Sequence, residues 1–221
     1  MQRLPVAALA AVVLMAGLAT SAAAGAIEAS IKDTGGKPVA EAVIIAVAPA
    51  GPRPASPRAG KIVVDQQNRQ FVPHVQPVVV GTEVVFPNKD NIRHHVYSFS
   101  PPKKFELPLY KGTEAPPVKF DKPGLVVLGC NIHDWMLGYV VVLETPHFQT
   151  TDASGRARLE SLPPGTYAVR VWHARLAEAD TPAPQTITIA AGKDERIELA
   201  LKLKPDVRLQ PPPSAGGGKY R

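Results

Sequence analysis

Residues 125–143 read LVVLGCNIHDWMLGYVVVL and form the most informative stretch of the chain. Two apolar runs rich in β-branched residues, at 125–128 and 138–143, flank a polar loop that begins after Gly129. Short apolar runs bounded by turn residues are typical of buried strands. We therefore expect a loop that is held on both sides by strands of a rigid sheet.

The loop carries Cys130, His133 and Met136 within seven residues. The chain has one cysteine and three methionines, and Met1 and Met15 lie in an N-terminal segment that we expect to be removed. The loop would then hold both sulfur atoms of the mature protein. A thiolate, an imidazole and a thioether are soft ligands that suit copper.

A thiolate site of this kind needs a second imidazole from another strand. Residues 88–98, NKDNIRHHVYS, supply two candidates, His94 and His95, where a strand begins after a polar turn. Neighbouring side chains of a strand point to opposite faces of the sheet, so we expect only one of the two histidines to face the loop.

Residues 61–143 resemble a plastocyanin-type cupredoxin, and their loop spacing is similar to that of the amicyanins. The resemblance is carried by Asn88-x-Asp90, by His94-x-Val96, by the FDKPG turn at 120–124 and by the loop of Cys130, His133 and Met136. Two positions depart from the family. Arg93 stands where the family often has proline before the first histidine, and Asp134 and Trp135 stand where proline and phenylalanine often follow the second histidine.

This resemblance implies a mononuclear type 1 copper site with His94, Cys130 and His133 roughly trigonal and Met136 as the weak axial ligand. In the family the first histidine stands six residues after the turn asparagine, which selects His94 and leaves His95 as the alternative. Type 1 sites exchange single electrons with a partner protein.

Three other interpretations of the loop stay open. Cys130 and Met136 are ordinary core residues in the first of them. The second is a catalytic pair of Cys130 and His133, although no donor set for an oxyanion accompanies it. The third is zinc at His94, Cys130, His133 and Asp134, which leaves the thioether unexplained because it is a poor zinc ligand. We expect copper and no enzymatic activity.

The rest of the chain predicts an all-β protein. Of 221 residues, 24 are proline, which argues against a mostly helical fold, and no segment shows a convincing helical period. Besides the runs at 125–128 and 138–143, short β-branched runs at 61–65, 78–80, 82–86 and 96–99 are expected strands. Such runs separated by Gly, Pro, Asn or Asp suit an antiparallel sandwich. The single cysteine excludes an internal disulfide framework and any site with several cysteines, such as an iron–sulfur cluster.

The two flanks of the cupredoxin-like segment resemble, when joined, a transthyretin-like (carboxypeptidase regulatory-like) β-sandwich. Expected strands at 27–31 and 42–47 precede the segment, and expected strands at 156–159, 166–172, 186–189 and 196–203 follow it. Neither flank has enough strands for a stable sandwich of its own. We therefore expect the cupredoxin to be inserted into this second sandwich; the alternative is that the N-terminal strands extend the cupredoxin sheet.

The expected organisation is a signal peptide at 1–24, outer strands and a proline-rich linker at 25–60, the cupredoxin domain at 61–145, the remaining outer strands at 146–205 and a disordered tail at 206–221. Arg3, the apolar run 6–18 and the small residues 21–24 are typical of a secretory signal cleaved after Ala24 or Ala26. Its removal leaves 24 basic and 19 acidic residues, spread along the chain, which argues against nucleic-acid binding.

These features together predict an exported, periplasmic copper protein that transfers single electrons. We expect a monomer with a redox partner protein and no membrane span in the mature chain. The alternatives are a periplasmic copper-binding or delivery protein without redox turnover and a non-catalytic copper subunit of an oxidoreductase system.

Overall fold

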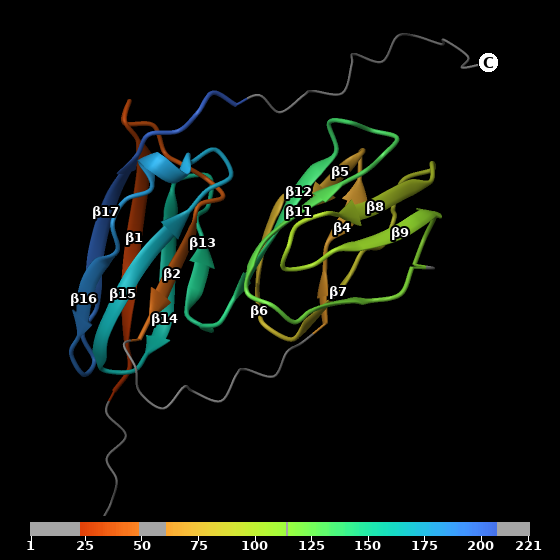
Figure 1. Ribbon diagram of the computed structural model, residues 1–221. Helices are drawn as coiled ribbons and strands as arrows, with labels where there is room; N and C mark the ends of the chain where they lie inside the picture. Colours follow the sequence, from red (N-terminus) through yellow and green to blue (C-terminus); the bar gives the residue numbers. More distant parts are fainter. Residues whose placement is uncertain (1–22, 49–60, 114, 207–221) are drawn as a thin grey trace, which may run out of the picture.

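The computed structural model describes residues 23–48, 61–113 and 115–206. Most of the expected signal peptide, the proline-rich linker 49–60 and nearly all of the expected tail lie outside these residues. The described chain forms two β-sandwiches that lie side by side (Figure 1). Its elements are strands apart from one short 3-10 turn at Glu178–Asp180, so the predicted all-β class is confirmed.

The outer sandwich consists of a three-stranded and a four-stranded sheet. The first has the order β14 (Arg156–Leu162), β1 (Gly25–Asp33), β17 (Glu195–Leu201), and the second has the order β13 (Phe148–Thr150), β2 (Val43–Val47), β15 (Gly165–Trp172), β16 (Gln185–Ile189). Alternate residues of β1, such as Ile27, Ala29 and Ile31, face a core between the two sheets.

Strands from both flanks of the chain share these sheets. β1 pairs with β14 and, in parallel, with β17, while β2 pairs with β13 and β15. No described ladder joins β1 or β2 to a strand of residues 61–143. This is the pairing that an insertion requires, and it differs from the alternative in which the N-terminal strands extend the inner sheet. The resemblance of the outer sandwich to transthyretin-like domains, and the domain boundaries, stay predictions.

The inner sandwich has one sheet of three strands, one of five, and a short hairpin. The three strands are β10 (Val118–Phe120), β7 (Thr82–Val85) and β3 (Lys61–Val63); the five are β6 (Val75–Val79), β12 (Leu137–Leu143), β11 (Gly124–Gly129), β8 (His94–Ser98) and β9 (Phe105–Tyr110); the hairpin joins β4 (Asp65–Gln67) to β5 (Gln70–Val72). Its core is built around Phe71, Phe86 and Phe120 and includes Cys130 and Met136.

Four strands have no counterpart among the expected ones, namely β5, β9, β10 and β13, and the single strand expected at 61–65 is divided between β3 and β4. β9 carries Pro108, which lowers its strand propensity, and the other three contain only three residues each. Such short segments show too little alternation to be recognised before their partners are known.

A third apolar cluster joins the two sandwiches. It contains Val43 and Ile45 from β2 together with Val75 and Val141 from the inner sheet. Ile44 and Ala46, which alternate with them along β2, face the outer core. Both faces of β2 are thus covered, which explains its uninterrupted apolar sequence. No helix in the described part of the chain is long and apolar enough to cross a membrane.

Candidate metal centre

The loop between β11 and β12 is fixed by the ladder on both sides of it. Gly129, the last residue of β11, pairs with Leu137, the first residue of β12. Within the loop the Met136 N–H donates a hydrogen bond to the His133 carbonyl at 2.9 Å. A Cβ at Gly129 would lie 2.8 Å from Cζ of Tyr97, so only glycine allows the Tyr97 ring to pack against the backbone just before Cys130.

His94 approaches the loop from β8. Its side chain is fully buried, and its Nε2 lies 2.7 Å from Oδ2 of Asp90. Asp90 is held in turn by the backbone N–H groups of Asn68 and Arg69, which donate to its two carboxylate oxygens at 2.7 and 2.8 Å. The ring of His94 is therefore oriented through Nε2, which leaves Nδ1 to face the loop.

Three donor atoms converge at this point. Sγ of Cys130 lies 3.9 Å from Nδ1 of His94 and 3.7 Å from Nδ1 of His133, and the three ligand atoms all lie within 4.8 Å of one another. In the part of the chain that the structure describes, no other cluster of three or more His, Cys, Asp or Glu side chains meets this spacing. Of the predicted site residues, the structure thus brings His94, Cys130 and His133 together.

Met136 lies in the same buried core cluster as Cys130 and is 1% exposed. A long thioether side chain fills core space well in any protein, so this burial alone does not distinguish packing from ligation. Its position in the loop keeps Met136 as the predicted fourth ligand.

His95 and Asp134 are not part of the cluster. The ladder between β8 and β9 is irregular between His94 and Val96, and Nε2 of His95 lies 2.8 Å from Oε1 of Glu106 on β9. Asp134 is exposed and does not join the three donors, so the structure does not assemble the alternative zinc tetrahedron.

The protonation of the cluster follows from its contacts. Burial raises the pKa of the Cys130 thiol, but hydrogen bonds from His94 and from the backbone N–H groups of His95 and Ile132 outweigh it, and the pKa is lowered overall. Burial lowers the pKa of His94, whereas its hydrogen bonds to Cys130 and Asp90 raise it, and the net change is upward. Burial and the nearby charge of His94 lower the pKa of His133.

Asp90 stays ionised in spite of its position. Burial raises the pKa of the carboxyl group, but the hydrogen bonds from Arg69, His94 and Asn68 hold it below its usual value. The cluster therefore combines a thiol with a lowered pKa, one imidazole with a raised pKa and one imidazole with a lowered pKa. A soft metal cation could be held between these donors in place of a proton.

Sequence reasoning did not assign a role to Asp90 or Glu106. The spacing of Asp90 four residues before His94 was a usable signal, because a turn brings such residues together. No pattern pointed to Glu106, since its contact with His95 depends on the register between β8 and β9.

One edge of the cluster reaches the surface. His133 is half-buried, and its ring centroid lies 5.2 Å from that of Trp135. Beside it, Ile132 is 46% exposed and Leu137 is 39% exposed. Cys130 and His94, in contrast, are covered by the core.

No family model matches the chain, and no curated protein matches it. Among solved structures, a copper-containing nitrite reductase from Thermus scotoductus SA-01 is 30% identical with a TM-score of 0.36; the match covers 38% of this chain and 22% of the reductase. A purple cupredoxin from Nitrosopumilus maritimus is 23% identical with a TM-score of 0.33, over 38% of this chain and 99% of that protein.

An amicyanin variant in its reduced state is 27% identical with a TM-score of 0.35, over 44% of this chain and 98% of amicyanin. All three likenesses are weak over the whole chain. The two sheets of the inner sandwich and the loop between β11 and β12 form the cupredoxin-like fold that the sequence resemblance predicts.

Proposed function

We propose that this chain holds one copper ion at His94, Cys130, His133 and Met136 and passes single electrons between partner proteins. The observation that carries the proposal is the approach of two imidazole Nδ1 atoms and one thiol within 4.8 Å of one another, from strand ends 36 residues apart. Two histidines and a cysteine with a weak axial methionine are typical of blue-copper sites.

The donor chemistry fits this ion. Cys130 has a lowered pKa and provides the thiolate, and both histidines present Nδ1. Asp90 accepts the hydrogen bond of the second nitrogen of His94, an arrangement that fixes the tautomer and orientation of a metal-binding histidine. A bound copper ion would supply a one-electron couple.

The exposure of the donors favours electron transfer over copper delivery. His133 gives the cluster an edge at the surface, and Ile132 and Leu137 make the surface beside it apolar. A partner that docks there comes within contact of one ligand ring. Cys130 and His94 are buried behind it, which hinders release of an ion. Delivery without redox turnover is the second candidate, and a non-catalytic subunit of an oxidoreductase is the third.

We propose that the chain is an electron carrier and not an enzyme, and we assign no catalytic residues. One similar structure is a nitrite reductase, but the match covers only 22% of that enzyme. We also propose export to the periplasm, because Arg3 and residues 6–24 have the pattern of a secretory signal. We further propose that the protein is a monomer, that its redox partner is a protein and that it does not bind nucleic acid.

A redox titration of the copper-loaded protein tests the electron-transfer role. We expect reversible uptake and release of one electron per chain over repeated cycles with ascorbate and ferricyanide, with copper retained throughout. Loss of the ion on reduction would instead support delivery, and binding of more than one strongly held ion would contradict the mononuclear site.

A further inference from the structure

His95 is a buried histidine that stands outside the donor cluster. Its side chain is 7% exposed, and its Nε2 lies 2.8 Å from Oε1 of Glu106, whose side chain is 70% exposed. Nδ1 of His95 is also buried and has no hydrogen-bond partner among the described residues. Burial of an unpaired polar atom costs free energy, so the partner of the other nitrogen matters. Within the described chain, Glu106 is the only polar partner of this ring.

The backbone of His95 reaches the metal site from the same position. Its N–H donates a hydrogen bond to Sγ of Cys130, as does the N–H of Ile132. The register between β8 and β9 shifts between His94 and Val96, where one residue of β8 stands opposite two of β9. A bulge of this kind disrupts the ladder locally and leaves a residue unpaired. The N–H of His95 is thus directed at the sulfur and not at the neighbouring strand.

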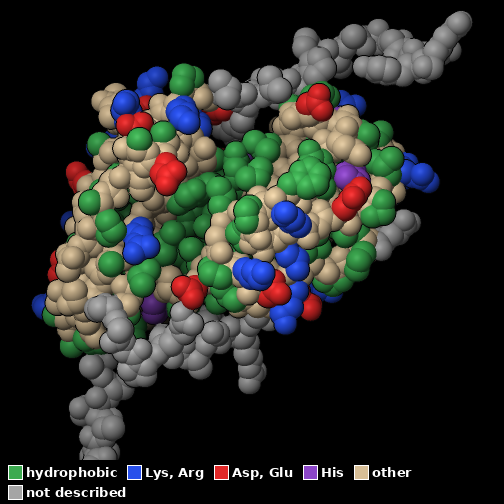
Figure 2. All heavy atoms as spheres, viewed as in Figure 1, with side chains coloured by type: hydrophobic (Ala, Val, Ile, Leu, Met, Phe, Trp, Pro, Cys, Tyr) green, Lys and Arg blue, Asp and Glu red, His purple; other side chains and the backbone are tan. Residues whose placement is uncertain are grey.

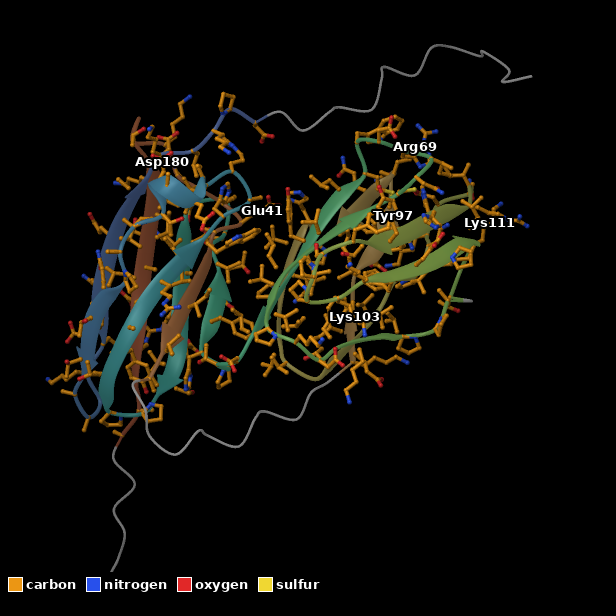
Figure 3. The ribbon with its side chains drawn as sticks, in the orientation of Figure 1. Glu41, Arg69, Tyr97, Lys103, Lys111 and Asp180 are labelled. Carbon is orange, nitrogen blue, oxygen red and sulfur yellow. The ribbon has the colours of Figure 1, made fainter. Side chains whose placement is uncertain are left out.

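Glu106 lies where the ring of His95 needs a partner. Glu106 pairs with Tyr97 in the ladder between β8 and β9, and the Tyr97 ring lies 5.5 Å from that of His95, measured between centroids. Tyr97 marks this place in Figure 3, and Figure 2 shows that acidic and basic side chains are exposed over the same lobe. The ring is therefore held on one side by Tyr97 and at its polar end by Glu106.

A side chain that is fixed at its far end restrains the backbone to which it belongs. The regular ladder does not hold His95, so the direction of its N–H depends on the ring and on the contact of that ring with Glu106. Hydrogen bonds around the cysteine sulfur tune the redox potential of blue-copper sites. They do so because they draw electron density away from the thiolate. A residue that holds the N–H of His95 in place would therefore act on the copper ion without touching it.

We propose that Glu106 is a positioning residue of the copper site. Through the ring of His95 it holds the His95 N–H against the sulfur of Cys130, and it thereby raises the reduction potential of the bound ion. This inference rests on the proposed copper site, but the positioning itself can be measured without the metal.

Hydrogen exchange of the metal-free full chain, kept reduced, tests the positioning. We expect the His95 amide to exchange about fivefold faster in Glu106→Ala than in the wild type, because one hydrogen bond of ordinary strength is weakened. Glu106→Gln keeps an acceptor oxygen for the ring and should retain the wild-type rate. Glu83→Ala, at an exposed glutamate on β7, is the matched control and should leave the rate unchanged.

The copper-loaded protein tests the effect on the ion. In Glu106→Ala the thiolate-to-copper band should move to longer wavelength and the reduction potential should fall, because the sulfur donates more strongly to the oxidised ion. Glu106→Gln and Glu83→Ala should match the wild type. The band should stay intense in every variant, since no donor is removed. In a His95→Ala background, Glu106→Ala should cause no further shift, because the ring that transmits its effect is gone.

An unchanged exchange rate or an unshifted band in Glu106→Ala would overturn the proposal. So would a band shift in Glu106→Gln as large as that in Glu106→Ala, or the same shift in the His95→Ala background, because the charge of Glu106 would then act directly on the ion. A wild-type protein without a thiolate band would contradict the copper site, whereas the exchange rates would still report whether Glu106 positions the N–H of His95.

Discussion

Nε2 of His94 lies 2.7 Å from Oδ2 of Asp90, and the same carboxylate accepts two backbone N–H groups from the turn between β4 and β5. The histidine that faces Cys130 is therefore oriented by a second residue, which is itself fixed by the neighbouring hairpin. Outer contacts of this kind fix the tautomer and orientation of a ligating histidine.

Replacing this carboxylate should weaken metal binding without removing the donors. In Asp90→Asn, we expect copper affinity to fall about 10- to 100-fold, the usual effect of losing a partner of a ligating histidine. Competition with a chelator of known affinity measures it. Asp121→Asn, an exposed aspartate in another turn, is the control. Equal affinities of the two variants would show that Asp90 does not act through His94.

The two adjacent histidines should respond differently. His94→Ala removes a donor of the cluster and should abolish the strong visible absorption of the copper-loaded protein. His95→Ala removes a side chain that contacts Glu106, on another part of the sheet, and should keep the absorption. Loss of the absorption only in His95→Ala would mean that His95, and not His94, is the copper ligand.

Gly129 should tolerate no side chain as long as Tyr97 is present. A Cβ there would lie 2.8 Å from the ring, so we expect Gly129→Ala to lower the free energy of unfolding by about 1–3 kcal/mol, measured in urea. The same change in a Tyr97→Ala background should cost much less, because the clash is gone. Equal costs in both backgrounds would place the strain elsewhere.

The contact between the sandwiches should matter for stability but not for the site. Ile45 lies in the apolar cluster that joins them, and we expect Ile45→Ala to reduce the free energy of unfolding by about 2–4 kcal/mol while the visible absorption of the bound copper is unchanged. Val63→Ala, at a residue that is 46% exposed, is the control and should cost far less. Spectral change in the Ile45 variant would mean that the outer sandwich shapes the metal site.

His147 should give the outer sandwich a pH dependence. Burial lowers the pKa of His147, whose ring lies against Tyr167 at a centroid distance of 5.9 Å. Below the unfolded pKa of about 6.5 the unfolded chain binds a proton more readily than the folded one, so stability falls as the pH drops from about 7 to 5. His147→Gln should reduce that slope in urea unfolding at a series of pH values; an unchanged slope would assign it to other groups.

The strands that the sequence predicted best are those with long β-branched runs. β11, β12 and β15 were expected within one or two residues of their observed bounds, because their residues alternate or are wholly apolar. β9 and β13 were not expected, since Pro108 interrupts the first and three residues cannot establish a period in the second. Tertiary pairing makes these segments strands.

The donor cluster could be predicted in part from the sequence. Cys130, His133 and Met136 share one loop, so their proximity needs little beyond the sequence. The choice of His94 required the count from Asn88; in the structure His94 lies in the donor cluster and His95 lies against Glu106. The apolar cluster that joins the two sandwiches depends on how they meet, and no local pattern encodes that arrangement.

The visible spectrum on addition of Cu(II) to the metal-free protein tests the central claim most directly. We expect an intense thiolate-to-copper absorption band that saturates at one ion per chain and is absent in Cys130→Ser, a variant of nearly the same shape without the sulfur. A wild-type protein that binds copper without such a band, or a band that persists in Cys130→Ser, would contradict the proposed site.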